Sequence, residues 1–122
     1  MSDPPQGDGG PSKSELQASH SAFEDAKAET QKLGASAQDL PDIDFVTFIL
    51  SLSHSALMHL GDAHNPSTGT IERNLPMARQ TIDLIALMEQ KTSGNLTGEE
   101  ERVVEQALYD LRMRYVEVAG SQ

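Results

Sequence analysis

The sequence predicts an all-α fold, in the form of a small antiparallel bundle of three main helices. Residues 44–60, 75–92 and 97–118 each repeat large apolar residues at the helical spacings of three and four. A side chain suited to capping a helix N-terminus stands before each of these segments. Turn-forming Gly, Pro and Asn residues separate the segments. The chain has 122 residues, which is enough for one small domain.

Composition narrows the class of protein. The chain has no cysteine, so disulfides, thiolate metal sites and a cysteine nucleophile are excluded. Nine basic against nineteen acidic residues give a formal charge of −10, which disfavours binding to nucleic acid. No apolar run is long enough to cross a membrane, and the N-terminus does not resemble a signal peptide. We therefore expect a soluble, cytoplasmic protein.

Residues 1–40 are expected to form a flexible acidic tail. The first twelve are dominated by Pro and Gly and cannot bury enough apolar surface to offset their ordering entropy. Residues 13–33 are rich in helix formers, and Ser12 with Glu15 fits a capping box. Because only Leu16, Phe23 and Leu33 are large and apolar, the sequence predicts a marginal helix. Whether this helix docks on the rest of the chain stays open.

Residues 41–119 are expected to form the helical domain, and its first helix is unusually apolar. Asp42 or Asp44 can cap the N-terminus, and Gly61 can adopt the left-handed conformation that ends the helix. Between Asp44 and Asp62 there is no charged residue. The polar residues recur every four positions and so form one narrow stripe: Thr47, Ser51, Ser55 and His59.

The second and third helices carry clear start signals. Asn74 can cap the second helix, with Pro76 tolerated in its first turn. Thr97 and Glu100 form a capping box for the third helix. Asp110 and Arg114 stand four apart and are expected to pair. The third helix has a core stripe at alternating spacings of four and three: Val104, Leu108, Leu111, Tyr115 and Val118.

The first two main helices carry more apolar surface than three short helices can bury among themselves. Each helix of a small bundle buries about a 100° stripe. We therefore expect a homo-oligomer, most simply a two-fold dimer. The alternative is a monomeric bundle with an exposed apolar patch. The predicted interface consists of Phe45, Phe48, Ile49, Leu52, Leu57, Leu84, Leu87 and Met88.

Charged and tyrosine side chains of the second and third helices form a second candidate site. If these helices pack antiparallel, their Arg and Asp residues approach each other. One interpretation is a salt-bridge network that fixes the register of the helices. The other is an Arg-lined site for an anion or a partner's carboxylate. The cluster comprises Arg79, Asp83, Asp110, Arg112, Arg114 and Tyr115.

Several segments resemble a bacterial family, the domain of unknown function numbered 1844. The similar segments follow one another in the family's order: 44–52, 55–61, 74–84, 91–97 followed by three glutamates, and 108–117. The resemblance covers about residues 42–118. It implies a compact helical domain in a bacterial cytoplasm behind a variable N-terminal tail, with no assigned activity. The chain departs from the family pattern at residues 62–66, which puts any partner contact of that loop in doubt.

The sequence therefore favours a non-catalytic, oligomerising interaction or adaptor module. No nucleophile, phosphate-binding or dinucleotide-binding motif is present, and no cofactor or small-molecule substrate is indicated. One alternative is a metal-dependent hydrolase with His59, Asp62 and His64 as ligands. Their spacing fits poorly, because metal-binding histidines on one helix face stand three or four apart. Another alternative is a peripheral membrane protein that uses the first main helix, which lacks the expected Lys and Arg.

Overall fold

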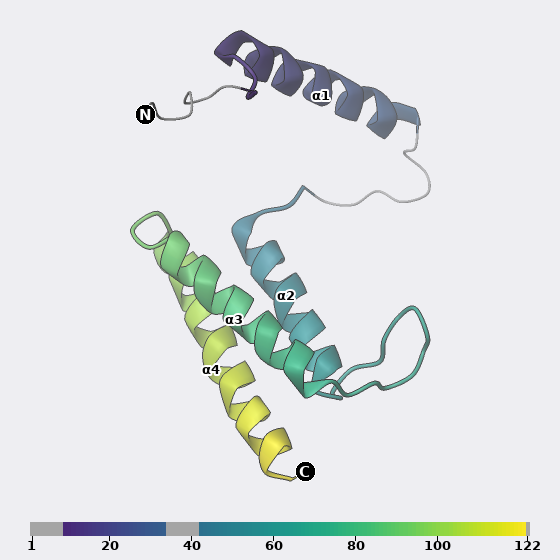
Figure 1. Cartoon of the computed structure of the whole chain (residues 1–122), viewed down its shortest axis with the longest axis vertical. Helices are drawn as coiled ribbons and strands as arrows, with labels where there is room; N and C mark the ends of the chain where they lie inside the picture. The colour runs from purple at the N-terminus through teal and green to yellow at the C-terminus, as the bar shows by residue number, and fades with distance from the viewer. Residues whose placement is uncertain (1–8, 34–41, 122) are drawn as a thin grey trace, which may run out of the picture. The chain divides into compact units, whose positions relative to one another are not determined.

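The computed structural model describes residues 9–33 and 42–121 (Figure 1). The chain falls into two compact units, Met1–Pro41 and Asp42–Gln122. The described residues form helices and no strands, which confirms the predicted all-α class. Their bounds are Lys13–Leu33 for α1, Phe45–His59 for α2, Leu75–Lys91 for α3 and Gly98–Gly120 for α4.

The first unit contains α1, which occupies the predicted residues 13–33. It begins at the predicted capping box, since Ser12 Oγ accepts from the backbone N–H of Glu15 at 3.2 Å and Glu15 accepts from that of Ser12 at 2.8 Å. Lys27 lies 5.3 Å from the ring centre of Phe23 and pairs with Glu24 at 3.4 Å. Local interactions of this kind are worth a few tenths of a kcal/mol each. Disorder is predicted for residues 1–12, of which residues 1–8 lie outside the described residues, as does the predicted helix end at Gly34.

The second unit starts with α2, whose two ends follow the predicted signals. Of the two candidate caps, Asp44 is the one used, and its carboxylate accepts from the backbone N–H of Thr47 at 2.8 Å. Leu60 is the C-cap, and Gly61 follows it with φ of +87°. This left-handed conformation is readily available only to glycine, so Gly61 ends the helix as predicted.

The caps of α3 and α4 are also the predicted ones. Asn74 accepts from the backbone N–H of Met77 at 3.1 Å. Thr97 and Glu100 form the reciprocal capping box, with distances of 3.1 and 2.8 Å. The expectation that α4 ends at residue 118 is wrong, because the helix continues to Gly120. Val118 is buried in the core and thereby holds the last turn in place.

The core of this unit lies where α2, α3 and α4 meet, since each of these helices contacts the other two. The one buried polar residue among those described, Thr81, donates from Oγ1 to the backbone carbonyl of Met77 at 2.9 Å. No buried side-chain polar atom in the described part of the chain lacks a partner. The buried apolar residues are Ile49, Ala56, Leu60, Ala78, Ile82, Ile85, Val104, Leu108, Leu111 and Val118.

We expect Ile85→Ala to lower the free energy of unfolding by about 3 kcal/mol, because Ile85 is fully buried and its truncation leaves a cavity. Urea unfolding followed by circular dichroism measures the change. The matched control is Ile71→Ala, in an exposed loop residue, which should cost less than about 1 kcal/mol. Equal losses in the two variants would contradict this description of the core.

Candidate functional site

An apolar face runs along α2 and α3 on the side away from α4. On α2, Leu50 and Leu57 line a groove against α4, so Phe48 and Leu52 lie on the opposite flank. On α3, Arg79 and Asp83 border α4, so Leu84 and Met88 lie on the flank toward α2. We call the surface formed by Phe45, Phe48, Leu52, Met77, Leu84, Leu87 and Met88 the α2–α3 face.

Helices α2 and α3, which carry the α2–α3 face, are joined at one end by a backbone hydrogen bond. The backbone N–H of Asn74 donates to the carbonyl of His59 at 2.7 Å. Phe48, Leu84 and Leu87 retain between 37% and 43% of their full exposure, although each is large and apolar. Phe45, Leu52 and Met88 are half-buried at the edge of the core. Six of the eight predicted interface residues are therefore residues of the α2–α3 face that keep part of their surface exposed.

The other two predicted interface residues lie elsewhere. Ile49 is fully buried in the core, which removes it from any surface that another chain could contact. Leu57 lines the groove between α2 and α4, which has a volume of about 340 Å³. Sequence reasoning placed both residues on the interface because a helix that is apolar nearly all round does not indicate which side faces its own core.

The predicted polar cluster is divided between two places. Arg79, Asp83, Arg112 and Tyr115 line one hollow of about 200 Å³ between α3 and α4. The predicted pairing of Asp110 with Arg114 is wrong. Asp110 accepts a hydrogen bond from Gln106 at 2.9 Å, and its side chain borders the α2–α4 groove.

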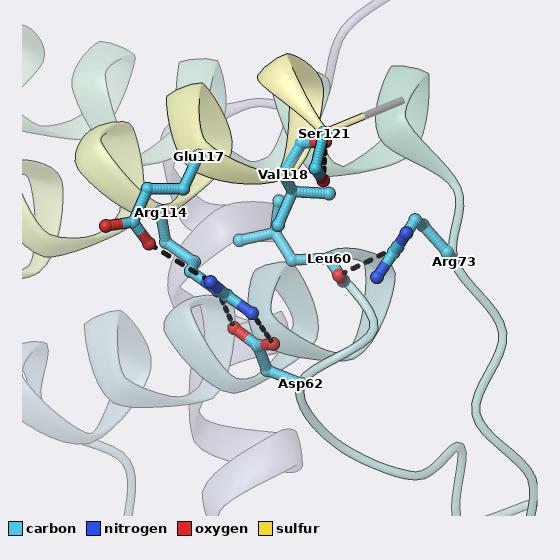
Figure 2. Close-up of polar contacts among 7 residues, drawn as sticks. All are labelled: Leu60, Asp62, Arg73, Arg114, Glu117, Val118 and Ser121. Carbon is cyan, nitrogen blue, oxygen red and sulfur yellow. Dashed lines mark hydrogen bonds and ion pairs between the residues drawn. The ribbon is translucent and has the colours of Figure 1, made fainter.

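Arg114 instead bridges two segments that are far apart in the chain (Figure 2). Its Nε and Nη2 atoms donate to the two carboxylate oxygens of Asp62 at 2.7 and 2.8 Å, which is a bidentate pair. Nη1 donates to Glu117 at 3.0 Å. Asp62 directly follows the Leu60–Gly61 turn, so this contact ties the end of α2 to α4.

A second contact closes the same corner. Nε of Arg73 donates to the backbone carbonyl of Leu60 at 3.3 Å, which satisfies a carbonyl at the end of α2 (Figure 2). A Cβ atom at Gly61 would lie 3.1 Å from that Nε atom. Glycine at this position thus provides both the left-handed backbone and the space for Arg73.

Electrostatics agree with this geometry. The two hydrogen bonds from Arg114 hold the pKa of Asp62 below its ordinary value, against a smaller opposing effect of burial. In the loop before α3, hydrogen bonds from Thr68, Thr70 and Asn65 lower the pKa of Glu72. Both carboxylates are therefore ionised at neutral pH and engaged by donors of the chain itself.

The alternatives predicted from the sequence can be placed on this structure. Asp62, which a metal site with His59 and His64 would require, has both oxygens engaged by Arg114. Within residues 9–33 and 42–121, no group of three His, Asp or Glu side chains is arranged to hold a metal ion. None of the helices formed by these residues combines the length and hydropathy needed to cross a membrane.

Sequence reasoning missed the Asp62–Arg114 and Arg73–Leu60 contacts. Asp62 and Arg114 stand 52 positions apart, and no local pattern pairs residues at such a distance. A partial signal did exist, because Asp62 directly follows a predicted helix-ending glycine. The neighbours of such a glycine lie at the end of the helix, where the chain turns toward the next element.

Comparison with known proteins identifies a family for the described domain. The model of the domain of unknown function DUF1844 matches residues 42–117. The chain therefore belongs to this family, as the resemblance of its segments predicted. No curated protein and no solved structure matches the chain. The matched region begins just before Asp44, the cap of α2, and ends at Glu117, the second partner of Arg114.

We expect Asp62→Asn to lower the Tm at neutral pH by roughly 3 °C, because the variant loses a charge-assisted, partly exposed pair. The folded-state pKa of Asp62 lies below the unfolded-state value of about 3.9. The pair's contribution is therefore complete above the unfolded-state pKa and is lost as the pH falls through the folded-state pKa. The Tm difference should consequently shrink as the pH falls and disappear below the folded-state pKa of Asp62. Thermal unfolding at a series of pH values measures it.

The matched control is Asp110→Asn, since Asp110 has a hydrogen bond only to its own helix among the described residues. Its Tm should change by less than that of Asp62→Asn at neutral pH. A Tm loss in Asp62→Asn that stayed constant into acid would show that the ion pair is not its cause.

Proposed function

We propose that the protein is a non-catalytic, self-associating interaction module of the bacterial cytoplasm, whose copies meet through the α2–α3 face. The observation that carries this proposal is the partial exposure of Phe48, Leu84 and Leu87, three large apolar side chains on two helices that contact each other. Scattered exposed apolar residues are normal on a monomer, but a contiguous patch of large ones marks an interaction site. The proposal includes an antiparallel arrangement of α2, α3 and α4.

The distribution of charge supports the choice of this face. The chain carries a formal charge of −10, so two copies repel each other over most orientations. The segment from Phe45 to His59 contains no Asp, Glu, Lys or Arg. Two copies can therefore approach through α2 and the adjoining flank of α3 without bringing like charges together. The remaining acidic surface is free to engage a larger protein, as expected of an adaptor.

The ionisable groups whose pKa values are shifted support a non-catalytic role. Catalytic acids and bases are commonly found where burial or neighbouring charges shift a pKa within a cleft. In the described residues, the carboxylates with lowered pKa values are accounted for by structural contacts. Asp44 caps α2, Asp62 binds Arg114, and Glu72 binds the threonines of its own loop. Each of these carboxylates is engaged by donors of the chain itself, which supports a structural role for it.

The test replaces Leu84 with Glu and measures the mass of the full chain in solution by light scattering. The substitution is tolerated in a monomer, because the side chain is 43% exposed, but it places a charge in each half of the proposed interface. We expect the dissociation constant to rise by roughly a hundredfold or more, which corresponds to about 3 kcal/mol.

The matched control is Leu50→Glu, which changes the same residue type on the same domain but on the α4 side of α2. Circular dichroism should show an unchanged helix content in both variants. An assembly that keeps the mass of the unaltered chain in Leu84→Glu, or that is reduced equally in Leu50→Glu, would contradict the assignment to the α2–α3 face.

A further inference from the structure

A second set of apolar side chains lies on α4, on the side that faces away from the core. Tyr109, Met113 and Val116 are 64%, 48% and 61% exposed. Their spacing of four and three places them on one side of the helix. The core stripe of α4 uses other positions, among them Leu108 and Leu111. The outer row therefore adds nothing to the chain's own core, which leaves it available to another surface.

This row borders three hollows between α3 and α4 that share lining residues and are treated together as one groove. The end near the α3–α4 turn holds about 510 Å³ and carries Glu89, Glu101 and Glu105. A middle part of about 270 Å³ shares Glu89 and Glu105 with that end and also includes Tyr109 and Arg112. The far end of about 200 Å³ shares Arg112 with the middle part. It also contains Arg79 and Asp83.

The groove is thus acidic at one end and carries two arginines at the other. Glu105 and Arg112 stand seven positions apart, which is two helical turns, and so lie on the same side of α4. The point midway between them falls at Leu108 and Tyr109. Neither Glu105 nor Arg112 forms an ion pair with another described residue. Arg112 shares its hollow with Asp83 and with a second arginine, Arg79. Glu105 and Arg112 are therefore available to pair with opposite charges of another surface.

We propose that this groove face is occupied by a second copy of the chain, with the two α4 helices crossing antiparallel about a two-fold axis near Tyr109. A two-fold axis at this point sets Glu105 against Arg112 of the second copy, and Arg112 against its Glu105. An isologous contact repeats each pair, so both charges of both copies are neutralised. The outer apolar row, which includes Tyr109 and Met113, packs between these two pairs.

Charge complementarity is the reason to name a second copy as the occupant. The glutamates at one end of the groove are complementary to the arginines at the other end. A second copy can therefore supply the opposite charge at both ends. An acidic nucleic-acid backbone would match only the arginine end and would be repelled by the three glutamates. This contact uses a different face from the proposed α2–α3 contact and goes beyond it. Two distinct two-fold contacts on one chain produce assemblies larger than a dimer.

Charge reversal tests the contact in the full chain. In the background of Leu84→Glu, which removes the α2–α3 contact, we expect a dimer held by α4 alone. Glu105→Arg sets arginine against arginine twice, and Arg112→Glu sets glutamate against glutamate twice. Each should weaken this dimer by at least roughly tenfold in sedimentation velocity. An equimolar mixture of the two variants restores both pairs, and native mass spectrometry should show the heterodimer.

The matched controls are Glu29→Arg and Lys32→Glu, which make similar charge changes on α1. Neither should affect the dimer. The same reversals in the otherwise unaltered chain should reduce the assembly to the dimer held by the α2–α3 face, which provides a second measurement should Leu84→Glu disturb folding. A mixture that stays monomeric, or single reversals that leave the dimer intact, would overturn the α4 contact.

The mass of Leu84→Glu distinguishes failure of the α2–α3 contact from failure of the α4 contact. If Leu84→Glu is already monomeric, the α4 contact is overturned and the α2–α3 contact is supported. If Leu84→Glu has the mass of the unaltered chain, the α2–α3 contact is overturned. In that case the charge reversals still decide the α4 contact.

Discussion

The burial of α2 between α3 and α4 is the constraint on which the rest of the structure depends. Ile49, Ala56 and Leu60 recur at helical spacing and are completely excluded from solvent. They meet Ile85 of α3 and Leu108 of α4, so a single core holds all three helices. Because the core lies on one side of α2 while α2 is apolar on several sides, the same constraint also generates the exposed surface. An apolar helix packed against only two neighbours leaves a flank uncovered.

The far end of α2 shows how the chain leaves this core. Gly61 ends the helix, Arg73 satisfies a carbonyl of the last turn, and Arg114 holds Asp62 against α4. Each contact is modest when considered alone, because partly exposed ion pairs contribute little. Together they fix the direction of the loop between α2 and α3. At the same corner, the backbone N–H of Asn74 donates to the carbonyl of His59 and joins the start of α3 to the end of α2.

Local chemistry made the elements predictable from the sequence. Asp44, Asn74 and Thr97 each act within three residues of their own position, so a single sequence carries the whole signal for these caps. The helix bounds followed, apart from the end of α4, where Val118 packs into a core formed by distant residues. Contacts across the chain were not predictable in this way. Arg114 has an acidic residue four positions earlier, yet it binds Asp62, because folding brings a closer carboxylate with better geometry.

The same distinction applies to the candidate surfaces. Sequence periodicity indicated that α2 and α3 carry excess apolar residues, and Phe48, Leu84 and Leu87 are indeed exposed. It could not place Ile49 in the core, since choosing between the apolar flanks of α2 requires the position of α4. The groove between α3 and α4 likewise depends on two helices being adjacent. The opposite charges of Glu105 and Arg112 could be related to each other only after the structure placed both residues along one groove.

The claim that another copy of this chain covers the exposed apolar surface is tested by the solution mass of the unaltered full chain. Sedimentation equilibrium from low micromolar to millimolar protein would measure it. The chain has a mass of 13.2 kDa. We predict a mass that rises with concentration to at least twice this value. A protein that stays dissolved at 13.2 kDa over the whole range would contradict the claim.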